Sequence, residues 1–346
     1  MSHITVQYKG KTYTCDTDRP LLSSLLSQGG FIPYSCQGGL CQACLCKVTQ
    51  GSVPKESQHG LDKHLQDQGC FYPCLCKPNE DLSIEVATKE NVVFEEKGIS
   101  SFDTYTSMVI DKSWLNPNTL RLCLVRPEPL QYKAGQFINL TQSENNLTRS
   151  YSLASLPCEN FMELHIKRVV NGKMSNWLCD TLQLGDNITI SGPSGDCYYQ
   201  QDHATQDLIL GGVGTGLAPL YGILRDAIES NHQGHIYLFH ASLNAEGLYY
   251  QDEIKEIVGD VTNFTYIPCV LHGDAPDNGK QGAIDQIIID SLGDCTGKRA
   301  YLCGDDAVVQ SMKERLLQNG LTNDDILADA FTFINEGDQN TQANDS

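Results

Sequence analysis

Four cysteines have a spacing that suits a metal centre: Cys36, Cys41, Cys44 and Cys74. Four residues separate the first from the second, two separate the second from the third, and twenty-nine separate the third from the fourth. Three thiolates on one short loop and a fourth from a distant segment are the ligand spacing of a 2Fe-2S cluster. The alternatives are unrelated buried cysteines or a zinc site, which usually combines two close cysteine pairs. The spacing therefore favours the 2Fe-2S cluster, which selects soft thiolate ligands.

The segments around these cysteines predict a small sheet crossed by a helix. Apolar residues alternate with polar ones in residues 3–15, and a glycine-containing turn lies at residues 9–11, which predicts a two-stranded hairpin. An apolar stripe in residues 21–26 predicts a helix. Residues 46–48 and 82–86 are expected to be further strands. Such a sheet is enough to hold the cysteine loop.

Residues 1–92 resemble the plant-type ferredoxin domain over their whole length. The resemblance rests on the spacing of the cysteines and on Pro78, four residues after the last of them. It implies a β-grasp-like α+β fold. It also implies that the metal ligands are Cys36, Cys41, Cys44 and Cys74.

Three residues of this segment depart from the family pattern. Gln42 stands where the family usually has glycine, and a glutamine would be strained if that position needs a positive φ. Cys46 and Cys76 each follow a predicted ligand by two residues and could substitute for it. Both lie in strand-like runs, where a free thiol packs as a small hydrophobe. We therefore expect them to be structural.

Length and composition limit the class of protein. A chain of 346 residues predicts about two or three domains. No apolar run approaches the roughly 18 residues that a membrane-spanning helix needs. The N-terminus lacks a basic region followed by an apolar core, so it is not a signal peptide, and we expect a cytoplasmic protein. In that compartment the 15 cysteines should be thiols or metal ligands.

The charge is strongly acidic and unevenly distributed. The formal net charge is −19, and residues 204–346 account for −15 of it, with 7 Lys+Arg against 22 Asp+Glu. Nucleic-acid binding is not expected, because phosphate contacts need clustered lysine and arginine. We interpret the acidic third as a solvated surface that favours solubility rather than as a docking surface.

Residues 104–203 are rich in predicted strands and follow a segment, residues 93–103, that we expect to be a linker. Proline, glycine and asparagine separate the strands. The six candidates are residues 106–110, 120–125, 137–140, 150–153, 162–166 and 187–190. Six strands in about 100 residues suggest an antiparallel six-stranded β-barrel.

The string Arg149-Ser150-Tyr151-Ser152 lies on one of these strands. An arginine can fork onto a phosphate. A tyrosine two residues later points to the same face of the strand and offers a flat ring for stacking. By itself the string fits a half-exposed strand equally well. It does not stand alone, because residues 172–175 open a helix predicted at residues 176–181, and a helix N-terminus attracts anions.

Together with Gly135-Gln136 and the string His165-Ile166-Lys167-Arg168, these features resemble the flavin domain of the ferredoxin–NADP reductase family. The resemblance implies FAD as the cofactor. It implies that Arg149 and Ser175 hold the FAD pyrophosphate, that Tyr151 stacks on the flavin ring, and that Ser152 contacts flavin N5 as a catalytic residue. The full set implied for FAD is Arg149, Ser150, Tyr151, Ser152, His165, Ile166, Lys167, Gly172, Lys173, Met174 and Ser175.

Residues 207–228 contain an apolar strand, a glycine-rich turn and an amphipathic helix. Such a turn lets backbone amides approach a pyrophosphate, although it is not the G-x-G-x-x-G fingerprint. Strands then alternate with helices, and one of the helices is expected at residues 249–258. This alternation predicts an open parallel α/β sheet for residues 204–334.

The string Tyr301-Leu302-Cys303-Gly304-Asp305 ends a strand at the carboxyl edge of that sheet, where such sheets bind ligands. A lone Cys303 would be read as an inert buried thiol. With its glycine and the upstream turn it resembles the nicotinamide domain of the same family, which implies a catalytic position beside the nicotinamide. The full set implied for NAD is Gly211, Gly212, Val213, Gly214, Thr215, Gly216, Pro219, Cys303, Gly304 and Asp305.

The choice between NADH and NADPH is expected to depend on residues 240–246. NADPH-specific relatives tend to have an arginine near Leu243, but no lysine or arginine follows the strand before Lys255, and Glu246 is acidic. An adenosine 2′-phosphate would find no obvious partner, so we expect NADH.

The order of the three segments resembles the reductase component of multicomponent bacterial mono- and dioxygenases over nearly the whole chain. The resemblance implies that electrons pass from NADH to FAD, then to the 2Fe-2S cluster, and then to an acceptor protein. A similar reductase that serves a deoxysugar dehydrase or another metalloenzyme is the alternative. A non-catalytic redox sensor that uses the cluster as a switch is a third reading, which the intact flavin and glycine-rich strings disfavour. A monomer is favoured, and residues 335–346 are expected to be disordered.

Overall fold

The structure is a computed structural model that describes residues 3–30, 32, 39, 44–61, 63–87, 91–92, 104–144 and 147–331. The predicted ligands Cys36 and Cys41, the linker at residues 93–103 and the tail at residues 335–346 lie outside the described residues. The chain forms two compact units. The first unit comprises Met1–Tyr105, Ile138–Ser150 and Thr189–Ser194, and the second comprises Thr106–Phe137, Tyr151–Ile188 and Gly195–Ser346.

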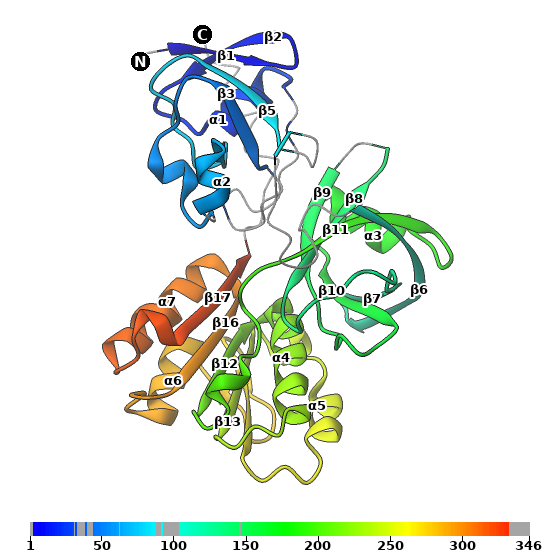
Figure 1. The fold of residues 1–346 in the computed structure, drawn as a ribbon. Helices are drawn as coiled ribbons and strands as arrows, with labels where there is room; N and C mark the ends of the chain where they lie inside the picture. Colours follow the sequence, from blue (N-terminus) through cyan, green and yellow to red (C-terminus); the bar gives the residue numbers. More distant parts are fainter. Residues whose placement is uncertain are drawn as a thin grey trace, which may run out of the picture. The chain divides into compact units, whose positions relative to one another are not determined.

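The first sheet has five strands in the order β2-β1-β5-β3-β4 (Figure 1). Its strands are β1 (His3–Tyr8), β2 (Lys11–Asp16), β3 (Cys46–Gln50), β4 (Cys70–Phe71) and β5 (Leu82–Val86). Strands β1 and β2 form the predicted hairpin, and both turn residues, Lys9 and Gly10, have positive φ. Strand β1 pairs with β5 in parallel, and β3 pairs antiparallel with both β5 and β4.

Helices α1 (Leu21–Ser27) and α2 (Lys63–Asp67) and the 3-10 turn η1 (Lys55–Gln58) accompany this sheet. Leu21, Leu22 and Leu25 of α1 are buried in one core with the inward side chains of the strands. The first turn of α1 is tied to the segment around Cys74, because the N–H of Leu22 donates to the carbonyl of Pro73 at 3.0 Å. The helix therefore fixes the backbone that carries the last predicted ligand.

The second sheet contains all six predicted strands, antiparallel in the pairings β10–β7 and β6–β7. Its order is β10-β7-β6-β11-β8-β9. The strands are β6 (Thr104–Asn116), β7 (Thr119–Val125), β8 (Phe137–Gln142), β9 (Leu147–Ser152), β10 (Phe161–Lys167) and β11 (Asn187–Ser194), and helix α3 (Lys173–Asp180) lies between the last two in the chain. An isolated antiparallel bridge joins Leu153, just after β9, to Leu164 of β10. It closes the sheet, which we call the barrel.

The third sheet is parallel throughout, with the order β15-β14-β13-β12-β16-β17. Its strands are β12 (Leu208–Val213), β13 (Ile236–Ser242), β14 (Phe264–Val270), β15 (Lys280–Gln281), β16 (Arg299–Asp305) and β17 (Ile326–Phe331). The helices are α4 (Leu217–Glu229), α5 (Gln251–Val258), α6 (Ile284–Leu292) and α7 (Asp306–Gln318), and the short turns are η2 (Gln201–His203), η3 (Gly214–Gly216), η4 (Ala245–Gly247) and η5 (Asn323–Asp325). We call residues 208–331 the parallel lobe.

Helices cover both faces of this sheet, with α4 and α5 on one side and α6 and α7 on the other (Figure 1). Two separate cores result, because alternate residues of β12 point to opposite faces. Leu208 and Leu210 pack with α4 and α5, whereas Ile209 packs with α6 and α7. The chain leaves β12 first toward β13 and later returns to β16 on its other side, so the sheet has a switch point between β12 and β16, where ligands of such sheets bind.

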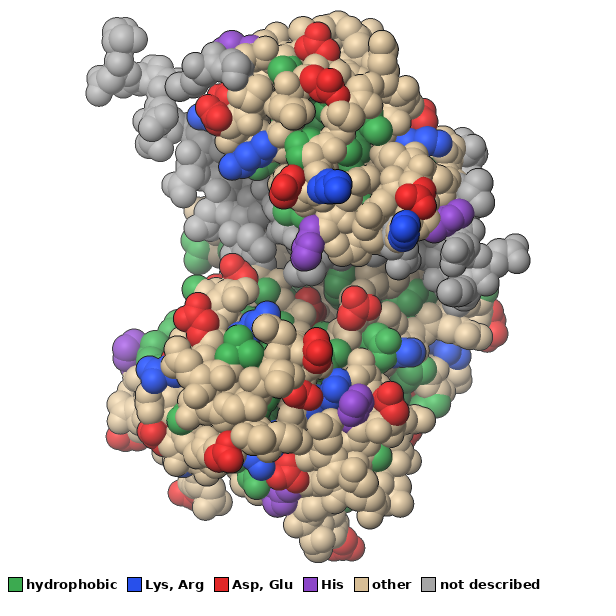
Figure 2. Space-filling view, turned by 60° about the vertical axis from the view of Figure 1, so that its left-hand side comes forward, with side chains coloured by type: hydrophobic (Ala, Val, Ile, Leu, Met, Phe, Trp, Pro, Cys, Tyr) green, Lys and Arg blue, Asp and Glu red, His purple; other side chains and the backbone are tan. Residues whose placement is uncertain are grey.

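Acidic side chains lie over the visible face of the parallel lobe, interspersed with lysine and arginine (Figure 2). Several pair locally, as Asp252 does with Lys255 at 3.0 Å and Asp207 with Lys298 at 2.8 Å. This distribution agrees with a solvated acidic surface. Within the described part of the chain, no helix combines the length and the apolar character that crossing a membrane requires.

Candidate functional site

The structure brings two of the four predicted cluster ligands together. Cys44 precedes β3 and Cys74 follows β4, and their Sγ atoms lie 3.4 Å apart in the core of the first sheet. Two thiolates on one tetrahedral metal at bonds of about 2.3 Å lie about 3.8 Å apart. The sulfur pair therefore fits ligands of one iron, and the ligand set as a whole stays a prediction.

A glycine adjusts the loop to the segment that follows Cys74. Gly39 has a φ of +79°, and a Cβ there would lie 2.5 Å from Cδ1 of Leu75. Glycine is therefore required at position 39, where the backbone has a positive φ and approaches the residue that follows Cys74.

The two extra cysteines, Cys46 and Cys76, are fully buried in the first core. Burial raises the pKa of the Cys76 thiol to about 12, and burial also raises the pKa of Cys46. Both therefore pack as neutral hydrophobes, in agreement with the structural role expected for them.

The Arg149–Ser152 string occupies the end of β9 as predicted. The guanidinium of Arg149 donates from Nη1 to the carbonyl of Thr148 at 2.8 Å, and the hydroxyl of Ser150 donates to Oδ1 of Asn139 at 2.6 Å. Arg149 and Tyr151 are half-buried. Since alternate residues of a strand share a face, these two side chains form one surface that can accept a phosphate at one end and a ring at the other.

Ser152 connects β9 to the parallel lobe. Its hydroxyl donates to Oδ2 of Asp329 at 2.8 Å, and both side chains are buried. Asp329 lies on β17 directly opposite Cys303 of β16. The contact thus joins the residue predicted to face flavin N5 with the strand pair that carries the residue predicted to face the nicotinamide. Asp329 was missed in the sequence, where its only signal is a carboxylate inside an otherwise apolar strand.

Close backbone contacts shape the switch point of the parallel sheet. Gly216 ends η3, and a Cβ there would lie 2.2 Å from the carbonyl oxygen of Cys303. Gly304 has a φ of +132°, and its Cβ would lie 2.9 Å from the carbonyl of Val213. Any side chain at these two glycines would push the ends of β12 and β16 apart. The first turn of α4, which contains Pro219, therefore starts close against Cys303.

Cys303 is fully buried, and burial raises the pKa of its thiol well above the ordinary value. Its Sγ lies 3.7 Å from Sγ of Cys197, a cysteine that the sequence analysis did not single out. Asp305 caps α7, since its carboxylate accepts the N–H of Ala307 at 3.1 Å. Cys303 and Gly304 thus lie at the carboxyl end of β16, as predicted, while the carboxylate of Asp305 is used within its own helix.

The remaining predicted FAD residues lie on β10 and α3. His165 is buried, with Nε2 3.0 Å from Glu163 and Nδ1 3.0 Å from the hydroxyl of Tyr249, so both ring nitrogens have protein partners. Ile166 is buried in the barrel, and Lys167 is exposed. The ring nitrogens of His165 are therefore not free to hydrogen-bond a cofactor.

Helix α3 begins at Lys173, three residues earlier than the sequence predicted. The hydroxyl of Ser175 accepts the N–H of Val169 at 3.2 Å and donates to the carbonyl of Gly172 at 3.4 Å. A Cβ on Gly172 would lie 2.6 Å from that hydroxyl. Ser175 closes the turn that starts the helix, and its role toward a pyrophosphate stays a prediction.

The stretch expected to select the coenzyme follows β13, which ends at Ser242. Leu243 is 65% exposed. Oδ1 of Asn244 accepts the N–H of Gly247 at 3.2 Å and so caps the η4 turn that contains Glu246. The stretch thus presents an apolar and an acidic side chain.

Comparisons with known proteins match each part of this description. A 2Fe-2S iron-sulfur cluster binding domain matches residues 4–79, an oxidoreductase FAD-binding domain residues 107–199, and an oxidoreductase NAD-binding domain residues 209–314. The chain is 30% identical to the phenol hydroxylase P5 protein of Acinetobacter pittii over 96% of this chain and 95% of that one. It is also 30% identical to the ferredoxin–NAD(P)(+) reductase component of the naphthalene 1,2-dioxygenase system of Pseudomonas putida, over 90% and 93%.

Among solved structures, the Amycolatopsis cytochrome P450 reductase GcoB superposes with a TM-score of 0.67 at 26% identity, covering 95% of this chain and 99% of that one. The predicted fold class of three domains and the predicted cofactors, a 2Fe-2S cluster, FAD and NAD, are confirmed. The chain therefore belongs to the ferredoxin–NAD(P)H reductase family, as a three-domain iron-sulfur flavoprotein and an NAD(P)H-dependent oxidoreductase.

Proposed function

We propose that this protein takes a hydride from NADH and delivers electrons singly to an acceptor protein, a terminal mono- or dioxygenase. When bound, FAD supplies the exchange between two-electron and one-electron chemistry, and the cluster carries single electrons. The observation that carries the proposal is the 2.8 Å hydrogen bond from Ser152 to Asp329. It brings the strand proposed to hold the flavin to the strand pair proposed to hold the nicotinamide.

The chain's own residues supply placement. Arg149 and the start of α3 at Ser175 would hold the FAD pyrophosphate, and the ring of Tyr151 would support the flavin from one face. Ser152, fixed by Asp329, would present its hydroxyl to flavin N5. Such fixed polar groups act without reorganising during the reaction.

The parallel lobe would hold the coenzyme at its switch point. The glycine-rich turn and the first turn of α4 would bind the pyrophosphate, while Cys303 and Gly304 would line the nicotinamide. The close approach of Gly216 to the carbonyl of Cys303 supports this, since it brings the glycine-rich turn against the end of β16. The exposed Leu243 and the acidic Glu246 support NADH over NADPH, because neither can pair with a 2′-phosphate.

The cluster would be held by Cys36, Cys41, Cys44 and Cys74. The domain limits in this proposal are residues 1–92 for the cluster, 104–203 for FAD and 204–334 for NAD, joined by a linker at 93–103 and followed by a tail at 335–346. We place the protein in the cytoplasm as a monomer.

The experiment starts with purified protein. We expect a yellow-brown spectrum that NADH bleaches, with reduction of ferricyanide and of cytochrome c, and at least a tenfold preference for NADH over NADPH in kcat/KM. A coloured protein that NADH fails to bleach would support the sensor reading. A tenfold preference for NADPH would overturn the choice of coenzyme.

The acceptor requires its own test. Oxygenase components and a deoxysugar dehydrase are each added to the NADH-reduced protein, and substrate turnover is measured for each. Turnover with an oxygenase supports the proposal, and turnover with the dehydrase alone overturns its last step.

A further inference from the structure

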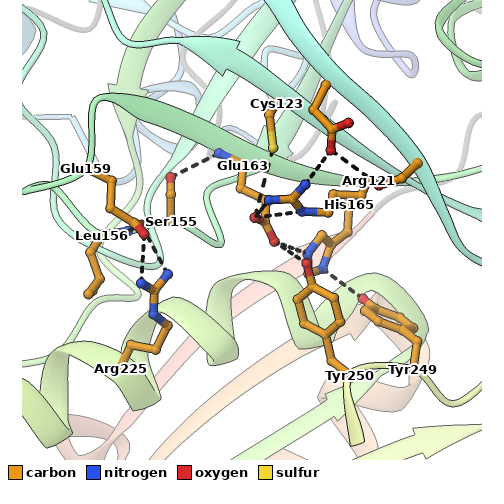
Figure 3. A network of polar contacts seen from close by, with 12 residues as sticks. Arg121, Cys123, Ser155, Leu156, Glu159, Glu163, His165, Arg225, Tyr249 and Tyr250 are labelled. Atoms are coloured by element: carbon orange, nitrogen blue, oxygen red, sulfur yellow. Dashed lines mark hydrogen bonds and ion pairs between the residues drawn. The ribbon is translucent and has the colours of Figure 1, made fainter. Parts of the chain in front are cut away.

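A buried carboxylate links the barrel to the parallel lobe inside the second unit (Figure 3). Glu163 of β10 accepts the hydroxyl of Tyr250 at 2.6 Å and the guanidinium of Arg121 at 2.9 Å, and it lies 3.0 Å from Nε2 of His165. The other ring nitrogen of His165 lies 3.0 Å from the hydroxyl of Tyr249. We call these five residues the Glu163 network. Two of them belong to the parallel lobe and three to the barrel.

The carboxylate stays ionised although it is buried. Burial alone would raise the pKa of Glu163, but the hydrogen bond and charge of His165, the hydroxyl of Tyr250 and the charge of Arg121 lower it to about 2. A buried ionised group is stable only while its partners stay in place, because an unpaired one has a large desolvation cost. The network is therefore a directional contact between the two parts.

The aromatic rings fix the same geometry. The ring of His165 meets Tyr249 and Tyr250 edge-on, with centroids 5.2 and 5.0 Å away. Tyr250 has a φ of +60°, which is unusual for a side chain of its size. The backbone thus adopts an unfavourable conformation where the hydroxyl reaches Glu163, and surrounding contacts must hold it there.

The network is joined by a backbone contact to the segment that directly follows β9, the strand proposed to hold the flavin. The N–H of Ala154, two residues after Ser152, donates to the backbone carbonyl of Glu163 at 2.9 Å. The bridge between Leu153 and Leu164 lies beside it. Glu163 therefore joins β9 through its backbone and the parallel lobe through its side chain.

Another ion pair between the same two parts differs in its exposure. Arg225 of α4 pairs with Glu159 at 2.8 and 3.0 Å, but the two side chains are 21% and 20% exposed, against 6% for Glu163 and 0% for His165. This bidentate pair also orients the two parts, but water reaches both of its side chains. Arg121 of the Glu163 network is 26% exposed as well, so the difference lies in the buried carboxylate and imidazole at the centre of the network.

We propose that Tyr249 and Tyr250 are positioning residues for hydride transfer, which act through Glu163 and His165 to set the parallel lobe against β9. The inference rests on the proposed function, because it concerns the distance between the nicotinamide side at Cys303 and the flavin side at Ser152. A misplacement of about 1 Å between reacting groups can lower a rate about a hundredfold.

The test compares Tyr250→Phe with Tyr132→Phe in the full-length holoprotein. Tyr132 is a matched control, since it is a buried tyrosine whose hydroxyl contacts, Ser155 and the carbonyl of Leu156, both lie within the barrel segment. Stopped-flow absorbance gives the limiting rate constant of flavin reduction and the Kd for NADH. We expect Tyr250→Phe to lower the rate constant about tenfold with little change in Kd, and Tyr132→Phe to leave it within about twofold.

Hydrogen exchange measured by mass spectrometry provides a readout apart from activity. We expect faster exchange in residues 161–167 and 247–258 of the Tyr250→Phe protein. In the Tyr132→Phe control, these residues should exchange at the wild-type rate. Light-driven reduction of the flavin and cluster without NADH should proceed at the wild-type rate, since it does not use the parallel lobe.

The outcomes separate the inference from the proposed function. A wild-type protein that NADH does not reduce would remove the proposed function, while the exchange data would still test the network. A wild-type protein that reacts, with Tyr250→Phe equal to Tyr132→Phe in both rate constant and exchange, would overturn the inference. If Tyr250→Phe does not fold, Tyr249→Phe, which removes the hydroxyl facing His165, is compared with the same control by the same criteria.

Discussion

Two pairs of buried thiols in this molecule have almost the same geometry and different surroundings. Cys44 and Cys74 lie 3.4 Å apart in the first sheet, and Cys197 and Cys303 lie 3.7 Å apart beside the parallel sheet. The first pair adjoins a loop with two more cysteines, whereas the second adjoins the glycine turn and Asp329. A close pair of sulfur atoms therefore does not make a metal site; the groups around it decide its chemistry.

The largest expected effect is at the first pair. Cys74→Ser should abolish cluster binding, because serine replaces a soft thiolate ligand with a hard oxygen. Iron and acid-labile sulfide analysis, with cytochrome c reduction, would measure the loss, while ferricyanide reduction by the flavin should persist. Cys76→Ser is the matched control and should retain iron. A cluster lost from Cys76→Ser and kept in Cys74→Ser would reverse our ligand assignment.

At the second pair, we expect a substitution of a neighbouring residue to affect flavin reduction more than a substitution of either cysteine. Ser152→Ala removes the hydroxyl that faces Asp329 and leaves a buried carboxylate without that donor. We expect flavin reduction by NADH to slow about a hundredfold, the size of effect seen when one preorganised polar group is removed from an active site. Stopped-flow absorbance would measure it. An unchanged rate constant would show that Ser152 is structural.

Acid should destabilise the second unit, because this unit contains the buried, ionised carboxylate of Glu163. The folded pKa of Glu163, about 2, lies below its ordinary value of 4.5, so its stabilisation is fully present above pH 4.5 and is lost as pH falls toward 2. Between pH 7 and pH 3 the loss from this group should be about 2 kcal/mol. Urea unfolding of wild-type and Glu163→Gln proteins at both pH values measures it. An equal pH dependence in the two would exclude Glu163 as the source.

The smallest expected effect is at the second pair itself. Cys197→Ala removes a buried sulfur and leaves a small cavity beside Cys303, which should cost about 1 kcal/mol of unfolding free energy. The iron content should not change, since this pair holds no cluster. Urea unfolding and iron analysis measure both. Loss of iron from Cys197→Ala would remove the distinction between the two pairs.

The sequence predicted well those features that are local. Three such features rest on residues close together in the chain: the hairpin at Lys9 and Gly10, the six strands of the barrel and the turn before α4. Periodicity and glycine placement act over a few residues, so a single sequence shows them.

Contacts between distant residues were not predictable in this way. Ser152 and Asp329 are 177 residues apart, and nothing near either one marks the partner. The strand-helix alternation predicts a helix over residues 249–258, which would include Tyr249 and Tyr250. In the structure α5 begins at Gln251, since the left-handed backbone of Tyr250 cannot be helical. The backbone is not helical at Tyr250, whose hydroxyl contacts Glu163. Glu163 is 87 positions away in the chain, so the local sequence does not show this contact.

The exposed Leu243 has a consequence for how such proteins diversify. Its side chain lies at the surface, and the adjoining turn is fixed by the cap from Asn244 rather than by Leu243. Replacing it should therefore change the folding free energy by no more than about 0.5 kcal/mol. Under the role proposed for Leu243, a substitution there that changes coenzyme choice would leave the stability of the protein almost unchanged. A substitution at Ser152 or Glu163 would not, because both side chains are buried and hydrogen-bonded to distant segments.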